Sequence, residues 1–271
     1  MSKPRLEGKV AIITGAASGI GEAAARLFAA NGAVVVIADI QDKLGLQVAA
    51  SIGGPDKCCY RRCDVTDEEQ VEATVAYALA TYGRLDIMYS NAGVLGLLAG
   101  TLDFSKEDFE RVMAVNVRGT ALAVKHAARA MLARGVRGSI VCTASVAGRQ
   151  GGHAFPVYTM SKHAVVGLVR AAAADLGQHG IRVNSVSPFM VATGMSTGMH
   201  GSTADTVEEF SAALANLKGG GVLKAAHVAE AAMFLASEES AFISGHDLVV
   251  DGGASVVYPS IMPALASLSK L

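Results

Sequence analysis

Two side chains that could exchange a proton lie four positions apart, in Tyr158-Thr159-Met160-Ser161-Lys162. If a helix begins near Tyr158, residues at this spacing stand on one face a turn apart, which places the lysine ammonium beside the phenol. A free phenol titrates near ~10, and a neighbouring cation favours the phenolate and lowers that pKa. Tyr158 could then accept a proton from a substrate. Tyrosine and lysine at this spacing can also merely decorate a helix, so the pair needs further support.

A third polar side chain precedes this pair. Ser145 follows the apolar segment Gly138-Ser139-Ile140-Val141-Cys142-Thr143-Ala144, which predicts a strand. A residue at that position would emerge at the carboxyl end of the strand, where open α/β sheets place their ligands. The Ser145 hydroxyl can hold a substrate oxygen there.

A glycine-rich segment near the amino terminus is the second functional signal. Thr14-Gly15-Ala16-Ala17-Ser18-Gly19-Ile20-Gly21 lies between the apolar run Val10 to Ile13 and a helical pattern from Glu22 to Ala30. Backbone without side chains can approach a pyrophosphate closely, and the following helix directs its first N–H groups at the charge. The segment therefore predicts a dinucleotide site, with cofactor contacts from Gly15, Ser18, Gly19, Ile20 and Gly21.

Asp39 indicates which dinucleotide binds. It falls at the end of the second predicted strand, where a carboxylate can accept hydrogen bonds from the adenosine ribose and would repel a 2′-phosphate. Neither Ala17 nor Ile40, which we also expect in the site, supplies the basic partner that a phosphorylated cofactor needs. We therefore expect NAD rather than NADP, although an aspartate at a strand end is also common without such a role.

The composition limits the possible classes of protein. A chain of 271 residues without a Pro- or Ser-rich linker is best interpreted as one large domain. Hydrophobic residues make up 51% and charged residues 17%, which predicts that some surface is buried against other subunits. A net charge of −1 and a pI near 6.7 give no electrostatic basis for binding nucleic acid or an anionic membrane. The four cysteines lack paired spacing and the histidines are scattered, so we expect no metal site.

Strand-like runs alternate with helical patterns along the chain. We expect strands at Val10–Thr14, Val34–Ala38, Cys59–Cys63, Leu85–Tyr89, Ser139–Thr143, Arg182–Val186 and Asp247–Val250, and helices at Glu68–Tyr82, Lys106–Ala133, Ser161–Gly177 and Ala226–Ala236. This alternation implies right-handed crossovers and a parallel sheet that is covered on both faces. The predicted fold is α/β, a single-domain Rossmann fold with a doubly wound, seven-stranded parallel sheet.

The glycine segment, followed in order by Ser145, Tyr158 and Lys162, resembles the short-chain dehydrogenase/reductase family. The resemblance extends from about Leu6 to Gly253. It implies further cofactor contacts from Asp64, Val65, Asn91, Ala92, Gly93, Tyr158, Lys162, Pro188, Val191 and Thr193. Two positions depart from the family pattern. Ser90 stands where the family usually has an asparagine, and Phe189 stands where it frequently has a glycine.

The same resemblance implies a fourth catalytic residue, Asn116. An asparagine is a poor helix former, and this one lies inside a long helical pattern. The resemblance implies that Asn116 bends the helix and holds a water molecule that relays protons towards Lys162. The alternative is an asparagine that only caps local backbone groups.

Weaker patterns surround the expected catalytic groups. From residue 194 to 221, glycines flank a short helical piece at Val207–Leu217, and we expect this segment to close over the substrate as a lid. The residues expected to line the substrate pocket are Leu95, Ser145, Val146, Phe155, Phe189 and Met195. Residues 254–271 are expected to form a C-terminal tail.

The tail ends in Ser269-Lys270-Leu271, the tripeptide of a peroxisomal import signal. The tripeptide makes peroxisomal import about as probable as a cytoplasmic location. No secretory signal is recognised at the amino terminus, so secretion is not expected. The family resemblance also implies a homotetramer, packed through the small-residue face Ala171-Ala172-Ala173-Ala174.

These expectations combine into one reaction, the NAD-dependent oxidation of a hydrophobic secondary alcohol to the ketone, with Tyr158 as general base. Segments such as Ala38-Asp39-Ile40-Gln41-Asp42 resemble the sequences of the plant secondary-metabolism group of the family. This group contains the isopiperitenol, borneol, xanthoxin and secoisolariciresinol dehydrogenases. That similarity implies a monoterpenol such as borneol or isopiperitenol. Two alternatives stay open: an NAD-binding terpenoid cyclase of the same fold without net redox chemistry, and a non-catalytic NAD-sensing binding protein.

Overall fold

The computed structural model describes residues 4–197, 202–219 and 221–257. These residues form a seven-stranded sheet in the order β3-β2-β1-β4-β5-β6-β7, with every neighbouring pair parallel. The strands are β1 (Val10–Thr14), β2 (Val34–Asp39), β3 (Cys58–Arg62), β4 (Ile87–Ser90), β5 (Ser139–Thr143), β6 (Arg182–Pro188) and β7 (Asp247–Val250). The doubly wound Rossmann sheet that the sequence predicts is confirmed.

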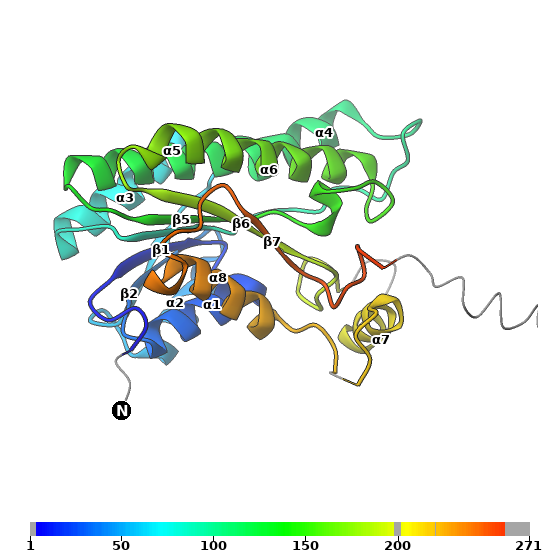
Figure 1. Ribbon diagram of the computed structural model, residues 1–271, viewed down its shortest axis with the longest axis horizontal. Coiled ribbons are helices and arrows are strands. Elements are labelled where there is room, and N and C mark those ends of the chain that lie inside the picture. Colours follow the sequence, from blue (N-terminus) through cyan, green and yellow to red (C-terminus); the bar gives the residue numbers. More distant parts are fainter. Residues whose placement is uncertain (1–3, 198–201, 220, 258–271) are drawn as a thin grey trace, which may run out of the picture.

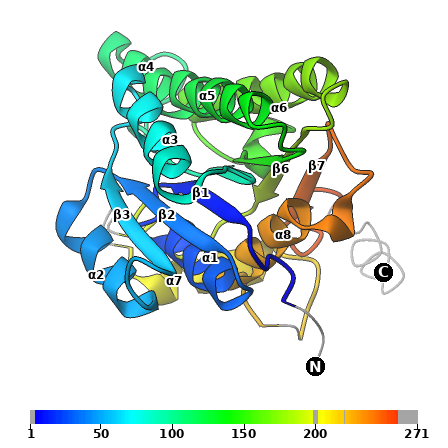
Figure 2. The same ribbon diagram turned by 90° about the vertical axis from the view of Figure 1, so that its left-hand side faces the viewer.

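Helices cover both faces of the sheet, so the molecule has three layers (Figures 1 and 2). One face carries α3 (Glu68–Tyr82), α4 (Lys106–Met113), α5 (Thr120–Ala133) and α6 (Pro156–Gly177). The other face carries α1 (Gly19–Ala30), α2 (Asp42–Ile52) and α8 (Ala225–Ala236), and the short α7 (Ala204–Leu214) lies on the same side. None of the helices in the described part of the chain has the length and apolarity needed to span a bilayer.

The central strands are apolar along their whole length because both of their faces are covered. In β1, Ile12 packs into the cluster shared with α3 and α5, whereas Ile13 packs into the cluster shared with α1 and α8. Successive side chains of a strand point to opposite faces, which explains why neither residue is polar. Burial of each such side chain contributes roughly 1.5–3 kcal/mol, and the rigid sheet that results fixes the positions of the loops at its carboxyl edge.

Several element boundaries differ by one or more residues from those expected, among them the starts of α6 and β4. Helix α6 begins at Pro156 rather than at Ser161, because a proline in the first helical turn loses no hydrogen bond. The earlier start places Tyr158 inside the helix, as its expected chemistry requires. Strand β4 begins at Ile87 rather than at Leu85, because the Asp86 side chain accepts a hydrogen bond from the Val10 amide at 2.9 Å.

The single helix expected at Lys106–Ala133 is three elements: α4, a π-helical turn at Ala114–Gly119, and α5. Asn116 lies in the π-helical turn and is fully buried. Such turns are rare and often occur at functional sites, because they reorient a side chain within a continuous helix. The expectation that the helix is distorted at Asn116 is therefore confirmed.

The segment expected to form a lid contains α7, which begins three residues earlier than the predicted helix. The capping hydroxyl of Thr203 accepts a hydrogen bond from the Thr206 amide and sets this start. Ser211 of α7 donates to the carbonyl of Met190 at 2.8 Å, which ties the segment to the chain after β6. Residues 198–201 and 220 of the segment, and the tail with Ser269-Lys270-Leu271, lie outside the described residues.

Candidate active site

A cleft of about 800 Å³ opens at the carboxyl ends of the strands. It spans the point between β1 and β4 where the strand order reverses, which is where open α/β sheets bind ligands. The glycine-rich loop after β1 lines one end, and the segments after β4, β5 and β6 line the rest. The cleft therefore joins the two groups of residues that the sequence singled out.

The glycine-rich loop approaches its neighbours so closely that side chains would not fit. A Cβ on Gly15 would lie 2.8 Å from the Cα of Ala92, and Gly15 has a φ of +65°. A Cβ on Gly19 would lie 3.2 Å from the Thr193 side chain, on the opposite wall of the cleft. Ser18 precedes α1 and makes no capping hydrogen bond through its side chain. The first amides of α1 are thus left for an anionic ligand such as a pyrophosphate.

Gly21 does not line the cleft, so the structure gives no support to its expected contact with the cofactor. A Cβ at this position would lie 2.2 Å from the Gly15 carbonyl oxygen and 2.7 Å from Nδ2 of Asn91. Gly21 lies within α1, one turn into the protein from the cleft. The residue is a glycine because the helix packs directly against the loop, a role that spacing alone does not separate from ligand contact.

Asp39 lies at the end of β2 with its carboxylate facing the loop. Oδ2 accepts a hydrogen bond from the Ala17 amide, and Oδ1 accepts one from the Gln41 amide, both at 2.9 Å. Asp39 and Ile40 both line the cleft. The nearby Arg62 guanidinium is bound to Asp42 at 3.0 Å and to the Ile40 carbonyl at 2.9 Å. Among the described residues, this corner of the cleft therefore presents a carboxylate, and its arginine, Arg62, is paired.

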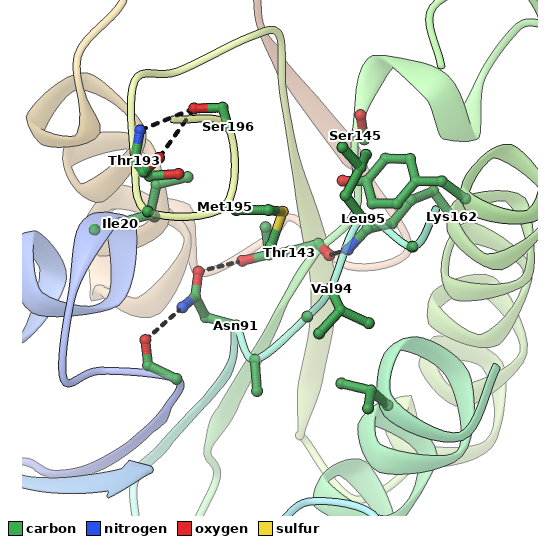
Figure 3. A pocket seen from close by; sticks show the side chains of 18 of the residues that line it. Ile20, Asn91, Val94, Leu95, Thr143, Ser145, Lys162, Thr193, Met195 and Ser196 are labelled. Carbon is green, nitrogen blue, oxygen red and sulfur yellow. Dashed lines mark hydrogen bonds between the residues drawn. The ribbon is translucent and has the colours of Figure 1, made fainter. Parts of the chain in front are cut away.

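Asn91 connects three strands at the centre of the cleft (Figure 3). Its Nδ2 donates to the carbonyls of Thr14 and Gly15 at 3.1 and 3.2 Å, and its Oδ1 accepts from Thr143 Oγ1 at 3.0 Å. Ala92 donates its amide to Thr14 Oγ1 at 3.0 Å. These bonds hold the centre of the cleft together. The cleft is also lined by Gly93, Asp64, Val65, Pro188, Val191 and Thr193, whose contacts with a cofactor stay a prediction.

Ser145, Tyr158 and Lys162 converge on one wall of the cleft. Lys162 Nζ lies 5.5 Å from the centroid of the Tyr158 ring and donates to the carbonyl of Thr143 at 2.8 Å. The Ser145 side chain lies near enough to the Tyr158 hydroxyl to lower its pKa in part, and it accepts from the Ala147 amide at 3.2 Å. Figure 3 shows Ser145 and Lys162 on one side of the pocket, Ile20 and Thr193 on the other, and Met195 between them. The predicted constellation is present.

The pKa of Tyr158 moves in the direction opposite to the one expected. Burial raises it to about 12, and the Ser145 side chain only partly offsets this effect. Burial also lowers the pKa of Lys162 to about 8, which the nearby Cys142 thiol counteracts in part. The expectation considered only the cation and omitted the loss of water around both groups. Burial therefore favours the protonated phenol, and added positive charge at the cleft would favour its ionisation.

Asn116 does not line the cleft, and its side chain is fully engaged. Oδ1 accepts from the Val94 amide at 2.8 Å, while Nδ2 donates to the Val94 carbonyl at 2.9 Å and to Ser161 Oγ at 3.0 Å. Asn116 and Lys162 still approach the same point, because a Cβ on Gly93 would lie 3.3 Å from Asn116 Oδ1 and 3.6 Å from Lys162 Nζ. Asn116 braces the loop after β4 against α6, and the water relay stays a prediction.

The rest of the cleft wall is mostly apolar. Of the expected substrate contacts, Leu95, Val146, Phe189 and Met195 line the cleft. Phe155 does not, and its side chain is 37% exposed. It occupies the extended position just before α6, so its neighbour Ala154 faces the cleft in its place. Sequence reasoning missed further lining residues, among them Arg111, Thr143 and His153. The position of His153, five residues before Tyr158, was an available signal.

Comparison with known proteins agrees with this geometry. A family model described as enoyl-(acyl carrier protein) reductase matches residues 15–255. Short-chain dehydrogenase reductase 4 of Arabidopsis thaliana is 57% identical over 252 residues, which cover 93% of this chain and 84% of that protein. (+)-cis,cis-nepetalactol synthase NEPS3 of Nepeta racemosa is 54% identical over 255 residues, which cover 93% of this chain and 94% of that protein.

Among solved structures, that of levodione reductase is similar with a TM-score of 0.85 and 31% identity, covering 94% of this chain and 100% of that one. The fold, the cleft and these relatives together define an oxidoreductase of the Rossmann type. The chain belongs to the short-chain dehydrogenase/reductase family. Members of this family typically bind a nicotinamide cofactor, and the loop at Gly15 and Gly19, which has no room for side chains, fits the pyrophosphate of such a group.

Proposed function

We propose that this protein oxidises a hydrophobic secondary alcohol to the ketone with NAD. The observation that carries the proposal is the convergence of Ser145, Tyr158 and Lys162 at the apolar end of a cleft whose other end is a glycine-rich loop. Bound there, a nicotinamide dinucleotide supplies the hydride acceptor for the reaction. The residues of the chain must then bind the alcohol oxygen and remove its proton.

Each of the three side chains has a distinct task. The Ser145 hydroxyl binds the carbinol oxygen and holds it at the Tyr158 hydroxyl, which lines the same part of the cleft. Tyr158, as phenolate, accepts the proton as the C–O bond becomes a carbonyl. The Lys162 ammonium, held in place by the carbonyl of Thr143 and 5.5 Å from the centroid of the Tyr158 ring, stabilises the phenolate through its charge. Ionisation of Tyr158 is costly in the buried site, and the ammonium together with the positive charge of the oxidised cofactor offsets that cost.

NAD is proposed over NADP because of the charge at the ribose corner. The Asp39 carboxylate lines the cleft there, and Arg62 is already occupied by Asp42. A 2′-phosphate would face a carboxylate without an available cation, which opposes its binding. The ribose hydroxyls of NAD can instead donate to the remaining lone pairs of Asp39.

The apolar lining of the substrate end supports a hydrocarbon-rich alcohol, and a monoterpenol such as borneol or isopiperitenol is our proposal. Leu95, Val146, Phe189 and Met195 give this end its apolar character. The similarity to nepetalactol synthases of Nepeta racemosa, at 50–54% identity, favours a second candidate function, cyclisation of a terpenoid without net redox chemistry. Steady formation of NADH from a monoterpenol separates the two functions, since a cyclase would form none.

Two further proposals concern the assembly and the location of the protein. We propose a homotetramer, supported by exposed small residues on one stripe of α6, Gly167, Ala171 and Ala174, of which Gly167 has open space where a Cβ would lie. We also propose a cytoplasmic or peroxisomal location, based on the sequence of the tail alone. Sedimentation as a monomer at working concentrations would contradict the tetramer, and a fluorescent fusion that keeps the C-terminus free would locate the protein.

Replacement of Tyr158 by Phe tests the general base. The variant keeps the ring and its packing but loses the hydroxyl, so we expect NAD binding within about twofold of the unmodified protein and a loss of kcat of at least about a thousandfold. Calorimetric titration with NAD and initial rates of NADH formation measure the two quantities. A variant with near-normal turnover would show that another group accepts the proton.

Replacement of Asp39 by Ala tests cofactor selection. Loss of the carboxylate removes both the ribose acceptor and the repulsion of a 2′-phosphate, so the ratio of kcat/KM for NAD to that for NADP should fall at least about tenfold. Asp39→Asn is the matched control, because it keeps the shape of the side chain and one acceptor oxygen. Its ratio of kcat/KM for NAD to that for NADP should lie between the ratios of the unmodified protein and of Asp39→Ala. Unchanged discrimination in both variants would remove Asp39 from this role.

A further inference from the structure

One polar side chain stands out on the apolar wall of the substrate end of the cleft. His153 lines the cleft and packs edge-on against Phe189, with ring centroids 6.0 Å apart and an interplanar angle of 85°. Its Nε2 shares a hydrogen bond of 2.5 Å with the side-chain amide of Gln150. Its other ring nitrogen, Nδ1, has no hydrogen-bond partner within the described residues. The imidazole is thus held from two sides and keeps one nitrogen for a ligand.

The other polar side chains of this end are already engaged. Arg111 donates to Asp108 Oδ1 at 2.6 Å, and Ser196 Oγ donates to the carbonyl of Val191 at 2.7 Å. Thr143 Oγ1 binds Asn91 and the hydroxyl of Tyr89, both at 3.0 Å. Each of these side chains thus has a partner within the protein, although Arg111 keeps further N–H donors, and His153 is the lining imidazole whose Nδ1 has no partner among the described residues.

An imidazole in this place is unfavourable for a purely hydrocarbon substrate. Such a substrate would strip water from Nδ1 and offer no hydrogen bond in return, which weakens its binding. A leucine would fill the same wall without this cost. An oxygen on the substrate removes the cost and turns the nitrogen into a source of selectivity, because sites built to bind a hydroxyl reject analogues that lack it.

We propose that His153 binds a second oxygen of the substrate, and that the preferred substrate is a hydrocarbon-rich alcohol with a further hydroxyl away from the reacting carbinol. This inference rests on the proposed alcohol oxidation and narrows its substrate class. A hydroxyl suits the site better than a carbonyl, because it can accept from Nδ1–H or donate to unprotonated Nδ1 and so matches either tautomer of the ring.

Two-point binding also explains how an apolar pocket can orient a compact molecule. Ser145 and Tyr158 hold the carbinol oxygen, His153 holds the second oxygen, and the apolar body packs against Val146 and Phe189. With both oxygens fixed, one face of the reacting carbon is turned towards the cofactor end of the cleft. Reactants held in this way gain rate from orientation.

The test compares pairs of alcohols that differ by one hydroxyl. Menthol and p-menthane-3,8-diol share a skeleton and a single oxidisable carbinol, since the added hydroxyl is tertiary; cyclohexanol and 1,4-cyclohexanediol form a second pair. Initial rates with NAD give kcat/KM for the unmodified protein, for His153→Leu, for His153→Gln and for the control His163→Leu, whose exposed imidazole lies on α6 away from the cleft.

We expect the unmodified protein and His163→Leu to prefer the diol of at least one pair by about tenfold or more. His153→Leu should lose that preference, mainly through KM because the contact exists in the bound substrate as well as in the transition state. His153→Gln should restore part of it. Equal diol preference in the unmodified protein and in His153→Leu would overturn the inference. A preference of the unmodified protein for the simple alcohols would also overturn it, and this second result does not depend on whether a variant folds.

The outcome for the proposed function is separate. Turnover of simple alcohols and diols with equal efficiency would refute the role of His153 and leave the proposed oxidation in place. An absence of NADH formation from every alcohol of both pairs and from borneol and isopiperitenol, despite measured NAD binding, would refute the oxidation and with it the inference.

Discussion

The buried contact between the Lys162 ammonium and the Tyr158 ring is the interaction on which the site depends. Both groups lose water on folding, which raises the pKa of the phenol and lowers that of the amine, so each is driven towards its neutral form. The hydrogen bond from Lys162 to the Thr143 carbonyl keeps the amine in place at the end of β5. Burial of a cation and a phenol side by side therefore lowers the stability of the fold. A charged ligand bound at this place can change the protonation of both groups.

The rest of the structure fixes that contact in space. Asn91 joins the loop after β1 to Thr143, so the dinucleotide end and the proton-transfer end of the cleft are connected through one side chain. The π-helical turn at Asn116 braces the loop after β4 against α6 through Ser161, one residue before Lys162. The local distortion of the helix is tolerated here because it lets the side-chain amide of Asn116 hydrogen-bond to two elements, the loop after β4 and α6.

Sequence patterns predicted the sheet and most of the site because these features have local signals. Buried parallel strands are continuous apolar runs, and the glycine loop and the spacing of Tyr158 and Lys162 are visible without coordinates. What failed depends on neighbours that are distant in sequence. Gly21 is small because of Gly15 and Asn91, and the pKa of Tyr158 is set by burial that no spacing reveals.

The same reason explains Phe155 and His153. Both lie in the short segment between β5 and α6, where no periodicity shows which side chains face the cleft. The start of α6 at Pro156 turns Phe155 outward, while Ala154 and His153 face the cleft. The proposed substrate contact of His153 therefore lies in a part of the chain whose conformation could not be predicted from pattern, whereas Tyr158 and Lys162 lie in a part whose conformation could.

The most direct test of the account is the ionisation of Tyr158 with and without cofactor. The ultraviolet phenolate signal that is lost in Tyr158→Phe, followed between pH 6 and 10.5, reports this one residue. Because its pKa is raised to about 12 in the protein alone, the phenol should stay protonated up to pH 10, and saturation with NAD should move its ionisation below pH 10. Half-ionisation of Tyr158 at or below pH 10 without cofactor, or a titration that NAD leaves unchanged, would contradict the claim that its proton release depends on added positive charge.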